Sequence, residues 1–263
     1  MPPQGPSDHA LSVARLAAEE LAGDGAAVLV GSPARGDAGP DGEDVLAVGP
    51  RTFSYRLERR GGLLVSTSSQ PADAYRRGMA NPGSVCTAVP GWREAVVLYD
   101  PNGEVRALIE EARAWTWGPL ERRCDGWVAG DITALAEEVH KLVAALRAGQ
   151  HTTAAVQRSV LALRPAQVLA VHRRTLYGSE NRLWDLVAEA MGEEWHVARS
   201  AALGLNGEPF EETCRAALEF YGLAVDNVYQ LLDERQRGVA NHARLLAALR
   251  ASLRACRPSG GQG

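Results

Sequence analysis

The sequence has no excess of positive charge. Its 263 residues include 28 Lys and Arg against 32 Asp and Glu, which gives a formal net charge of -4 and a pI near 5.9. Proteins that bind a nucleic-acid backbone usually carry clustered basic residues and have a high pI. We therefore expect no nucleic-acid partner for this chain.

Long apolar runs and closely spaced cysteines are missing as well. No stretch approaches the roughly 20 apolar residues that cross a bilayer, and residues 1–10 contain no basic segment followed by an apolar one. Cys86, Cys124, Cys214 and Cys256 lie far apart, which indicates neither a zinc site nor a disulfide framework. These features predict a cytoplasmic protein with reduced thiols and no membrane partner.

The sequence does contain a change in the spacing of its apolar residues near Pro119. Before it, short apolar runs of strand length alternate with helical patterns; after it, apolar residues recur at helical spacing only. The pattern predicts an α+β fold with a mixed β-sheet and helices over residues 1–117 and a helical bundle over 118–256. The Pro- and Gly-containing tail, 257–263, is predicted to be disordered.

Individual elements can be predicted from the same periodicities. The predicted strands cover residues 26–30, 45–48, 53–57, 63–67 and 95–99, and Gly61-Gly62 forms the turn of a hairpin. The predicted helices of the second half cover residues 131–148, 152–176, 181–191, 194–203, 209–232 and 235–256. Pro165 is expected to kink or split the second of these helices, because proline lacks the backbone N–H that a helix interior requires.

A short motif directly after the first predicted strand has the residue types of a phosphate-binding turn. It reads Gly31-Ser32-Pro33-Ala34-Arg35-Gly36. Glycine lets backbone N–H groups approach a phosphate closely, and a serine hydroxyl adds a hydrogen bond. The motif resembles the Gly-Ser-x-Ala-Arg-Gly pattern of the antibiotic-type nucleotidyltransferases, which include the kanamycin and lincosamide enzymes.

That resemblance implies a small mixed sheet joined to a helical domain, with substrate bound in the cleft between them. It also implies that Gly31, Ser32 and Arg35 bind the nucleotide or hold the loop that does so. An arginine at this place can pair with an acid and thereby fix the phosphate-binding turn. We therefore expect Arg35 to have a structural role in the motif.

The metal site of that family is matched only in part. Its Asp-x-Asp pair, which holds Mg²⁺ against the phosphates, falls on Glu43-Asp44-Val45, so a valine stands where the second acid is expected. The return strand at 64–68 offers hydroxyls where the family presents a third acid. Alternation places Asp44 on the opposite face from Glu43 unless a bulge intervenes, and Asp41 with Glu43 forms another i, i+2 pair. Glu43 and Asp44 are thus the candidate ligands of a weak or absent metal site.

Two further candidates lie in the first predicted helix of the bundle. In the antibiotic-type enzymes, a carboxylate from the first helix after the sheet acts as general base, and Glu138 or Glu137 is the matching position. Glu137 also precedes Lys141 by four residues, which is the spacing of a surface ion pair. His140 can exchange a proton near neutral pH. The predicted catalytic residues are Asp44, Glu138 and His140.

Three functions are compatible with these residues. The favoured one is a small-molecule enzyme of specialised metabolism that keeps a nucleotidyltransferase-like fold and uses acid–base chemistry, with no cofactor assigned. The first alternative is Mg²⁺-dependent transfer of a nucleoside monophosphate from an NTP to a small-molecule hydroxyl. The second is a non-catalytic binding protein. Mg²⁺ and NTP are expected only under the first alternative.

Overall fold

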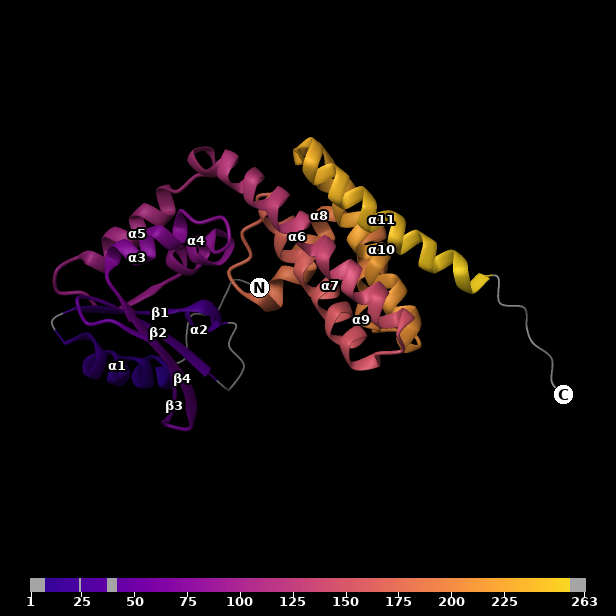
Figure 1. The fold of residues 1–263 in the computed structure, drawn as a ribbon. Coiled ribbons are helices and arrows are strands. Elements are labelled where there is room, and N and C mark those ends of the chain that lie inside the picture. Colours follow the sequence, from indigo (N-terminus) through magenta and orange to yellow (C-terminus); the bar gives the residue numbers. More distant parts are fainter. Residues whose placement is uncertain (1–7, 24, 37–41, 256–263) are drawn as a thin grey trace. The chain divides into compact units, whose positions relative to one another are not determined.

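The structure is a computed structural model that describes residues 8–23, 25–36 and 42–255 (Figure 1). The chain forms two compact units. The first comprises Met1–Leu120 and Leu176–Arg182, and the second comprises Glu121–Thr175 and Leu183–Gly263. A mixed β-sheet with helices is followed by a helical region, as predicted from the sequence. The predicted disordered tail, 257–263, lies outside the described residues.

The first unit is built on a five-stranded sheet with the order β3-β4-β2-β1-β5. Only β2 and β4 pair in parallel, and the remaining neighbours are antiparallel. This arrangement arises because β3 and β4 form a hairpin and β4 pairs with β2 along its other edge. The elements of this unit are α1 (Asp8–Ala22), β1 (Ala26–Val30), α2 (Gly31–Arg35), β2 (Gly42–Val48), β3 (Phe53–Arg60), β4 (Leu63–Gln70), α3 (Ala72–Met79), α4 (Val85–Arg93), β5 (Val96–Tyr99), α5 (Glu104–Ala114) and a short 3-10 turn, η1 (Gly118–Leu120).

One face of the sheet packs against α1. Leu29, Val45 and Val65, from three neighbouring strands, lie in one buried cluster with Val13 and Ala17 of α1. Helices α3, α4 and α5 lie on the opposite side (Figure 1). Because side chains alternate along a strand, the residues next to this cluster in sequence point to the face opposite α1.

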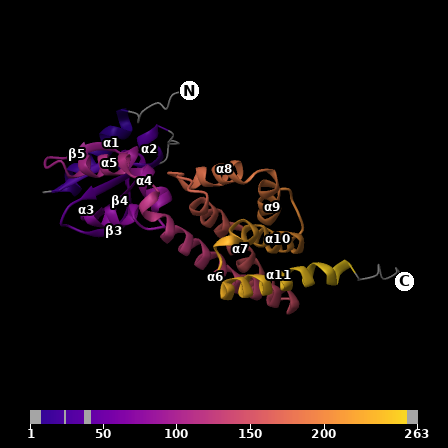
Figure 2. The same ribbon diagram turned by 90° about the horizontal axis from the view of Figure 1, so that it is seen from above.

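The second unit consists of helices. Helix α10 packs against α7, α9 and α11, and α6 packs against α7 and α11 (Figures 1 and 2). Its largest fully buried side chains include Trp195 and Phe220, whose ring centroids are 4.2 Å apart. The helices are α6 (Glu121–Arg147), α7 (His151–His172), α8 (Glu180–Met191), α9 (Glu193–Leu203), α10 (Phe210–Val228) and α11 (Glu234–Ala255), with the 3-10 turn η2 (Tyr229–Leu231) before α11. Within the described residues, no helix has both the length and the apolar character needed to cross a membrane.

Three helices differ from the sequence-based expectation. Helix α4 was not predicted, because Pro90 and Gly91 disfavour a helix interior, yet its apolar side chains are buried. Helix α6 begins at Glu121 rather than 131, since the burial of Cys124 and its neighbours outweighs the low helix propensity of two glycines. Pro165 does not split the helix: α7 runs through this buried proline without interruption.

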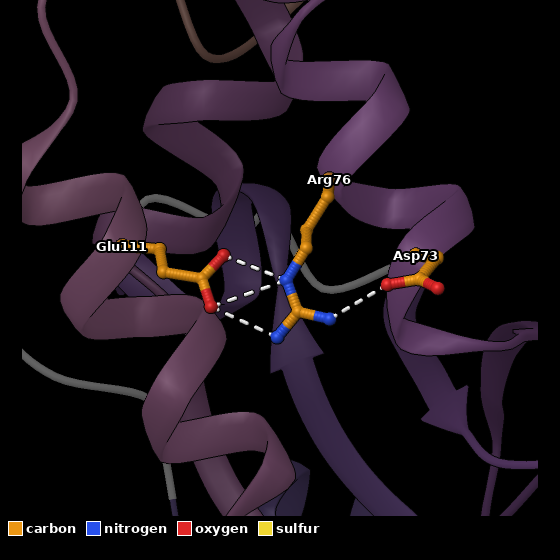
Figure 3. Close-up of polar contacts among 3 residues, drawn as sticks. All are labelled: Asp73, Arg76 and Glu111. Carbon is orange, nitrogen blue, oxygen red and sulfur yellow. Dashed lines mark hydrogen bonds and ion pairs between the residues drawn. The ribbon is translucent and has the colours of Figure 1, made fainter.

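Helices α3 and α5 are joined by a charged cluster centred on Arg76 (Figure 3). The Arg76 guanidinium donates hydrogen bonds to both carboxylate oxygens of Glu111, at 2.8–3.1 Å, and to Asp73 at 2.9 Å. The hydrogen bonds to Glu111 and then to Asp73 raise the pKa of Arg76 above its ordinary value. The bidentate geometry of Arg76 on Glu111 gives this ion pair more directional specificity than a single hydrogen bond would.

We predict that Glu111→Ala lowers the free energy of unfolding by about 0.5–1 kcal/mol, the usual value of an exposed ion pair. The loss should shrink at high salt, which screens the attraction. Urea denaturation at two salt concentrations measures it. Glu110→Ala is the matched control, because Glu110 pairs with Arg113 on its own helix. Equal losses in both variants would show that the α3–α5 link contributes nothing.

Candidate functional site

The predicted phosphate-binding turn is a sharp change from strand to helix. Strand β1 ends at Val30, and Gly31 begins the five-residue helix α2 with a φ of 76°. A Cβ atom added at Gly31 would lie 2.9 Å from Oδ2 of Asp44, closer than real Cβ contacts allow. Glycine is therefore required here both by its positive φ and by the carboxylate packed against it. Ser32, the second residue of α2, is half-buried.

Asp44 faces this turn from the neighbouring strand. It pairs with Val30 of β1 on one side and with Ser66 of β4 on the other, and the Ser66 hydroxyl donates a hydrogen bond to Asp44 Oδ1. The β1–β2 pairing is continuous from Ala26 to Val30, so Asp44 reaches this face without a bulge. The structure thus brings together Gly31, Asp44 and Ser66.

Val45, which the motif alignment places at an acid position, points the other way. Its side chain is fully buried in the cluster beneath α1. The residue that follows Asp44 on the same face is therefore Leu46, because alternate residues of a strand share a face. Glu43 of β2 lies opposite Val65 of β4, but its side chain is not among those the structure describes. Asp41 lies outside the described residues.

The sheet face around Asp44 is partly uncovered and partly apolar. Leu57 of β3 pairs with Ser66, and Tyr55 and Leu57 are 66% and 53% exposed. Leu64 of β4, two residues before Ser66, is 46% exposed. A hydroxyl and a carboxylate are thus bordered by exposed apolar side chains from β3 and β4. Such a surface suits a ligand with one polar end and an apolar or planar body.

Arg35 has the acid partner that was expected of it. Its guanidinium, with 8% of the side chain exposed, donates a 2.9 Å hydrogen bond to Glu94 at the end of α4. Gly178, which has a φ of 63°, lies against both members of this pair. The ion pair therefore ties α2 to α4 and to the segment Leu176–Arg182.

The segment Leu176–Arg182 is attached to α4 through hydrogen bonds to a carbonyl group that Pro90 leaves without a helical donor. Proline has no N–H, so the carbonyl of Cys86, four residues earlier in α4, lacks its usual helical donor. The backbone N–H groups of Tyr177 and Gly178 donate to this carbonyl instead, at 3.0 and 3.3 Å. Sequence reasoning missed Glu94 and Gly178 as partners of Arg35. The signal that could have located the attachment is a proline inside a helix, four residues after a carbonyl that needs a donor.

The other predicted catalytic residues lie in the second unit, on α6. Lys141 pairs with Glu137 at 2.9 Å and with Glu138 at 3.1 Å, and Glu138 is the less exposed of the two acids. The exposed ring of His140 stacks on His242 of α11, with centroids 5.1 Å apart. The shared role of Glu138 and His140 with Asp44 stays a prediction.

The metal implied by the motif needs several oxygen ligands in near-octahedral geometry. Along the face of Asp44, the neighbouring positions carry the hydrocarbon of Leu46 and the hydroxyl of Ser66. Within the described part of the chain, no group of three or more His, Cys, Asp or Glu residues is arranged to hold a metal ion. These described side chains do not fit a two-metal centre.

No protein-family model matches the chain, and no curated protein sequence does either. Among solved structures, the chain is similar to a nucleotidyltransferase-like protein from Exiguobacterium sibiricum 255-15. The identity is 14% and the TM-score 0.48, over 92% of this chain and 80% of that chain.

We predict that Gly31→Ala destabilises the protein more than Gly62→Ala does. Both glycines have positive φ, but a Cβ at Gly62 meets nothing within 4 Å. The unfavourable φ costs about 1–2 kcal/mol at either site, and crowding against Asp44 adds about 1–3 kcal/mol at Gly31 only. Chemical denaturation measures both losses. In an Asp44→Ala background the extra loss at Gly31 should disappear; if it persists, the close approach to Asp44 is not its cause.

Proposed function

We propose that the chain binds and chemically modifies a polar small molecule on the partly uncovered sheet face beside the Gly31 turn. Asp44 supplies the acid–base group, on a nucleotidyltransferase-like scaffold that works without a two-metal centre. The observation that carries this proposal is the position of Asp44. Its carboxylate lies against the turn, is held by the Ser66 hydroxyl, and borders a face that exposes Tyr55 and Leu57.

The hydrogen bond from Ser66 orients the carboxylate. An ionised carboxylate is an acceptor only, with about two lone pairs on each oxygen, so Asp44 can accept a second hydrogen bond beside that of Ser66. A ligand hydroxyl or ammonium group placed there would donate its proton to Asp44, which leaves the electron pair of the broken O–H or N–H bond on the ligand oxygen or nitrogen as a nucleophile. This is general base catalysis, which a positioned side chain supports without metal.

The exposed apolar residues indicate the rest of the ligand. Tyr55, Leu57 and Leu64 border the polar pair Asp44 and Ser66. A ligand that carries hydroxyl or amino groups on a ring or another compact carbon skeleton would cover these side chains while its polar group reaches Asp44. The chain's net charge of -4 favours a cationic ligand over an anionic one at long range.

We predict that Asp44→Asn abolishes the function while leaving the fold intact. A panel of aminoglycosides, nucleotides and small hydroxylated amines can be screened by thermal shift and then by calorimetry. Ligands that bind the wild type should bind Asp44→Asn at least about tenfold more weakly. Where turnover is found, kcat should fall by about 10²–10⁴-fold.

The matched control is Asp73→Asn, an exposed aspartate on α3 of the same unit. It should leave binding and turnover unchanged. Glu138→Ala and His140→Ala, made in parallel, report whether these residues take part in the same reaction. Binding that survives both Asp44→Asn and Ser66→Ala would remove this face from the function.

We predict weak or undetectable binding of Mg²⁺ and Mn²⁺, with or without ATP. The reason is that Leu46 and Ser66 stand beside Asp44 where further carboxylates would be needed. Calorimetric titration is the direct measurement. Tight, stoichiometric metal binding, or transfer of label from ATP onto an aminoglycoside, would establish nucleotidyl transfer instead. A Leu46→Asp variant, which adds an acid two residues along the same face, should bind Mn²⁺ more tightly than the wild type does.

A further inference from the structure

Strand β3 forms an outer edge of the sheet and is exposed on both faces. It is the first strand in the order β3-β4-β2-β1-β5, and every residue from Ser54 to Arg59 is exposed. An edge strand presents backbone N–H and C=O groups that can pair with a further strand. At eight residues, β3 is longer than a typical edge strand, and it carries the exposed apolar residues Tyr55 and Leu57.

The sequence of β3 is complementary to itself when two copies run antiparallel and are centred on Leu57. Arg56 of each copy then lies opposite Glu58 of the other, which gives two cross-strand ion pairs. On the other face, the two Leu57 side chains meet at the centre. The pairing of β3 with β4 is irregular between Phe53 and Arg56, so the regular part of the seam is the stretch from Arg56 to Arg60. Directly opposed residues of an antiparallel pair are neighbours, so these pairs are the ones that set its stability.

The other symmetric registers lack this complementarity. Centring the pair on Arg56, Glu58 or Arg59 places like charges directly opposite one another, which is destabilising. Centring it on Tyr55 forms no ion pair. Moving the centre of the pair by one residue changes the register by two residues. Side chains alternate with a period of two, so in each of these registers opposed residues still lie on the same face of the sheet. The charges of β3 therefore select one register.

We propose that β3 joins two copies of this chain into a dimer with one continuous sheet. The existing contacts of Glu58 are compatible with this pairing, since both hydrogen bonds from Arg60 go to its Oε2 and Arg60 also pairs with Glu20. Leu57 pairs with Ser66, so the seam runs beside the face that carries Asp44. The second copy would bring its own Leu57 and Tyr55 to that border.

The dimer is expected to be weak and concentration-dependent. A stable interface usually involves about 20–30 residues on each side, whereas the seam is one strand of eight residues and its immediate neighbours. Sedimentation of the full chain over a wide range of concentration should show the mass rising from 28.1 kDa toward twice that value. A mass that stays at 28.1 kDa at every concentration would overturn the proposal.

Charge reversal tests the register. Arg56→Glu and Glu58→Arg each place like charges opposite one another and should weaken dimerisation at least about tenfold. The double variant, Arg56→Glu with Glu58→Arg, restores opposite charges and should restore dimerisation. Circular dichroism and thermal melting confirm that each variant is folded. A dimer that neither single reversal weakens, or that the double variant does not recover, would refute this pairing.

A cysteine at the centre of the seam gives an independent test. In the proposed register, Leu57→Cys places two cysteines directly opposite each other. The Cα atoms of an opposed antiparallel pair lie about 4.5–5.5 Å apart, within the roughly 4.4–6.8 Å that a disulfide spans. Mild oxidation should produce a covalent dimer, in contrast to the wild type under the same conditions. Tyr99→Ala, on the opposite edge strand β5, is the matched control and should leave dimerisation unchanged. Loss of the dimer in Tyr99→Ala would place the interface at β5.

Discussion

The close approach of the Gly31 backbone to the Asp44 carboxylate is the constraint on which the rest of the site depends. A side chain at residue 31 would overlap Oδ2 of Asp44, so the turn can follow β1 at this point only with glycine. Because Asp44 pairs with Val30 and Ser66 at once, the same contact fixes the registers of three strands. A shift of one residue would place Val45 against the turn and expose the core.

The turn is also held from its other end. Arg35, the last residue of α2, pairs with Glu94 at the end of α4, and Gly178 closes over both. Pro90 has no backbone N–H, so the Cys86 carbonyl accepts hydrogen bonds from the backbone N–H groups of Tyr177 and Gly178 instead. The segment Leu176–Arg182, remote in sequence, thus becomes part of the first unit. Its amides satisfy a carbonyl that the helix itself cannot.

Local features of the fold were predictable from sequence, and long-range ones were not. Strand length and turn residues predict two of these local features. They are the strand Ala26–Val30 before a glycine and the Gly61-Gly62 turn between β3 and β4. Alternation also predicts that Asp44 and Val45 face opposite ways. It does not predict which face α1 covers, and that packing buries Val45 and leaves Asp44 beside the turn. The partner of Arg35, Glu94, lies 59 residues further along the chain, and no local sequence pattern connects the two.

The exposed strand β3 connects the site to the question of assembly. A long edge strand invites pairing with other chains, and charged side chains are the usual protection against it. In β3 the charges are of both signs and alternate with Tyr55 and Leu57, so they oppose most registers and favour one. Leu57 lies next to Ser66, and Ser66 holds Asp44. Binding of a ligand or pairing with a second copy at this border would cover Tyr55 and Leu57, which the sheet alone leaves exposed.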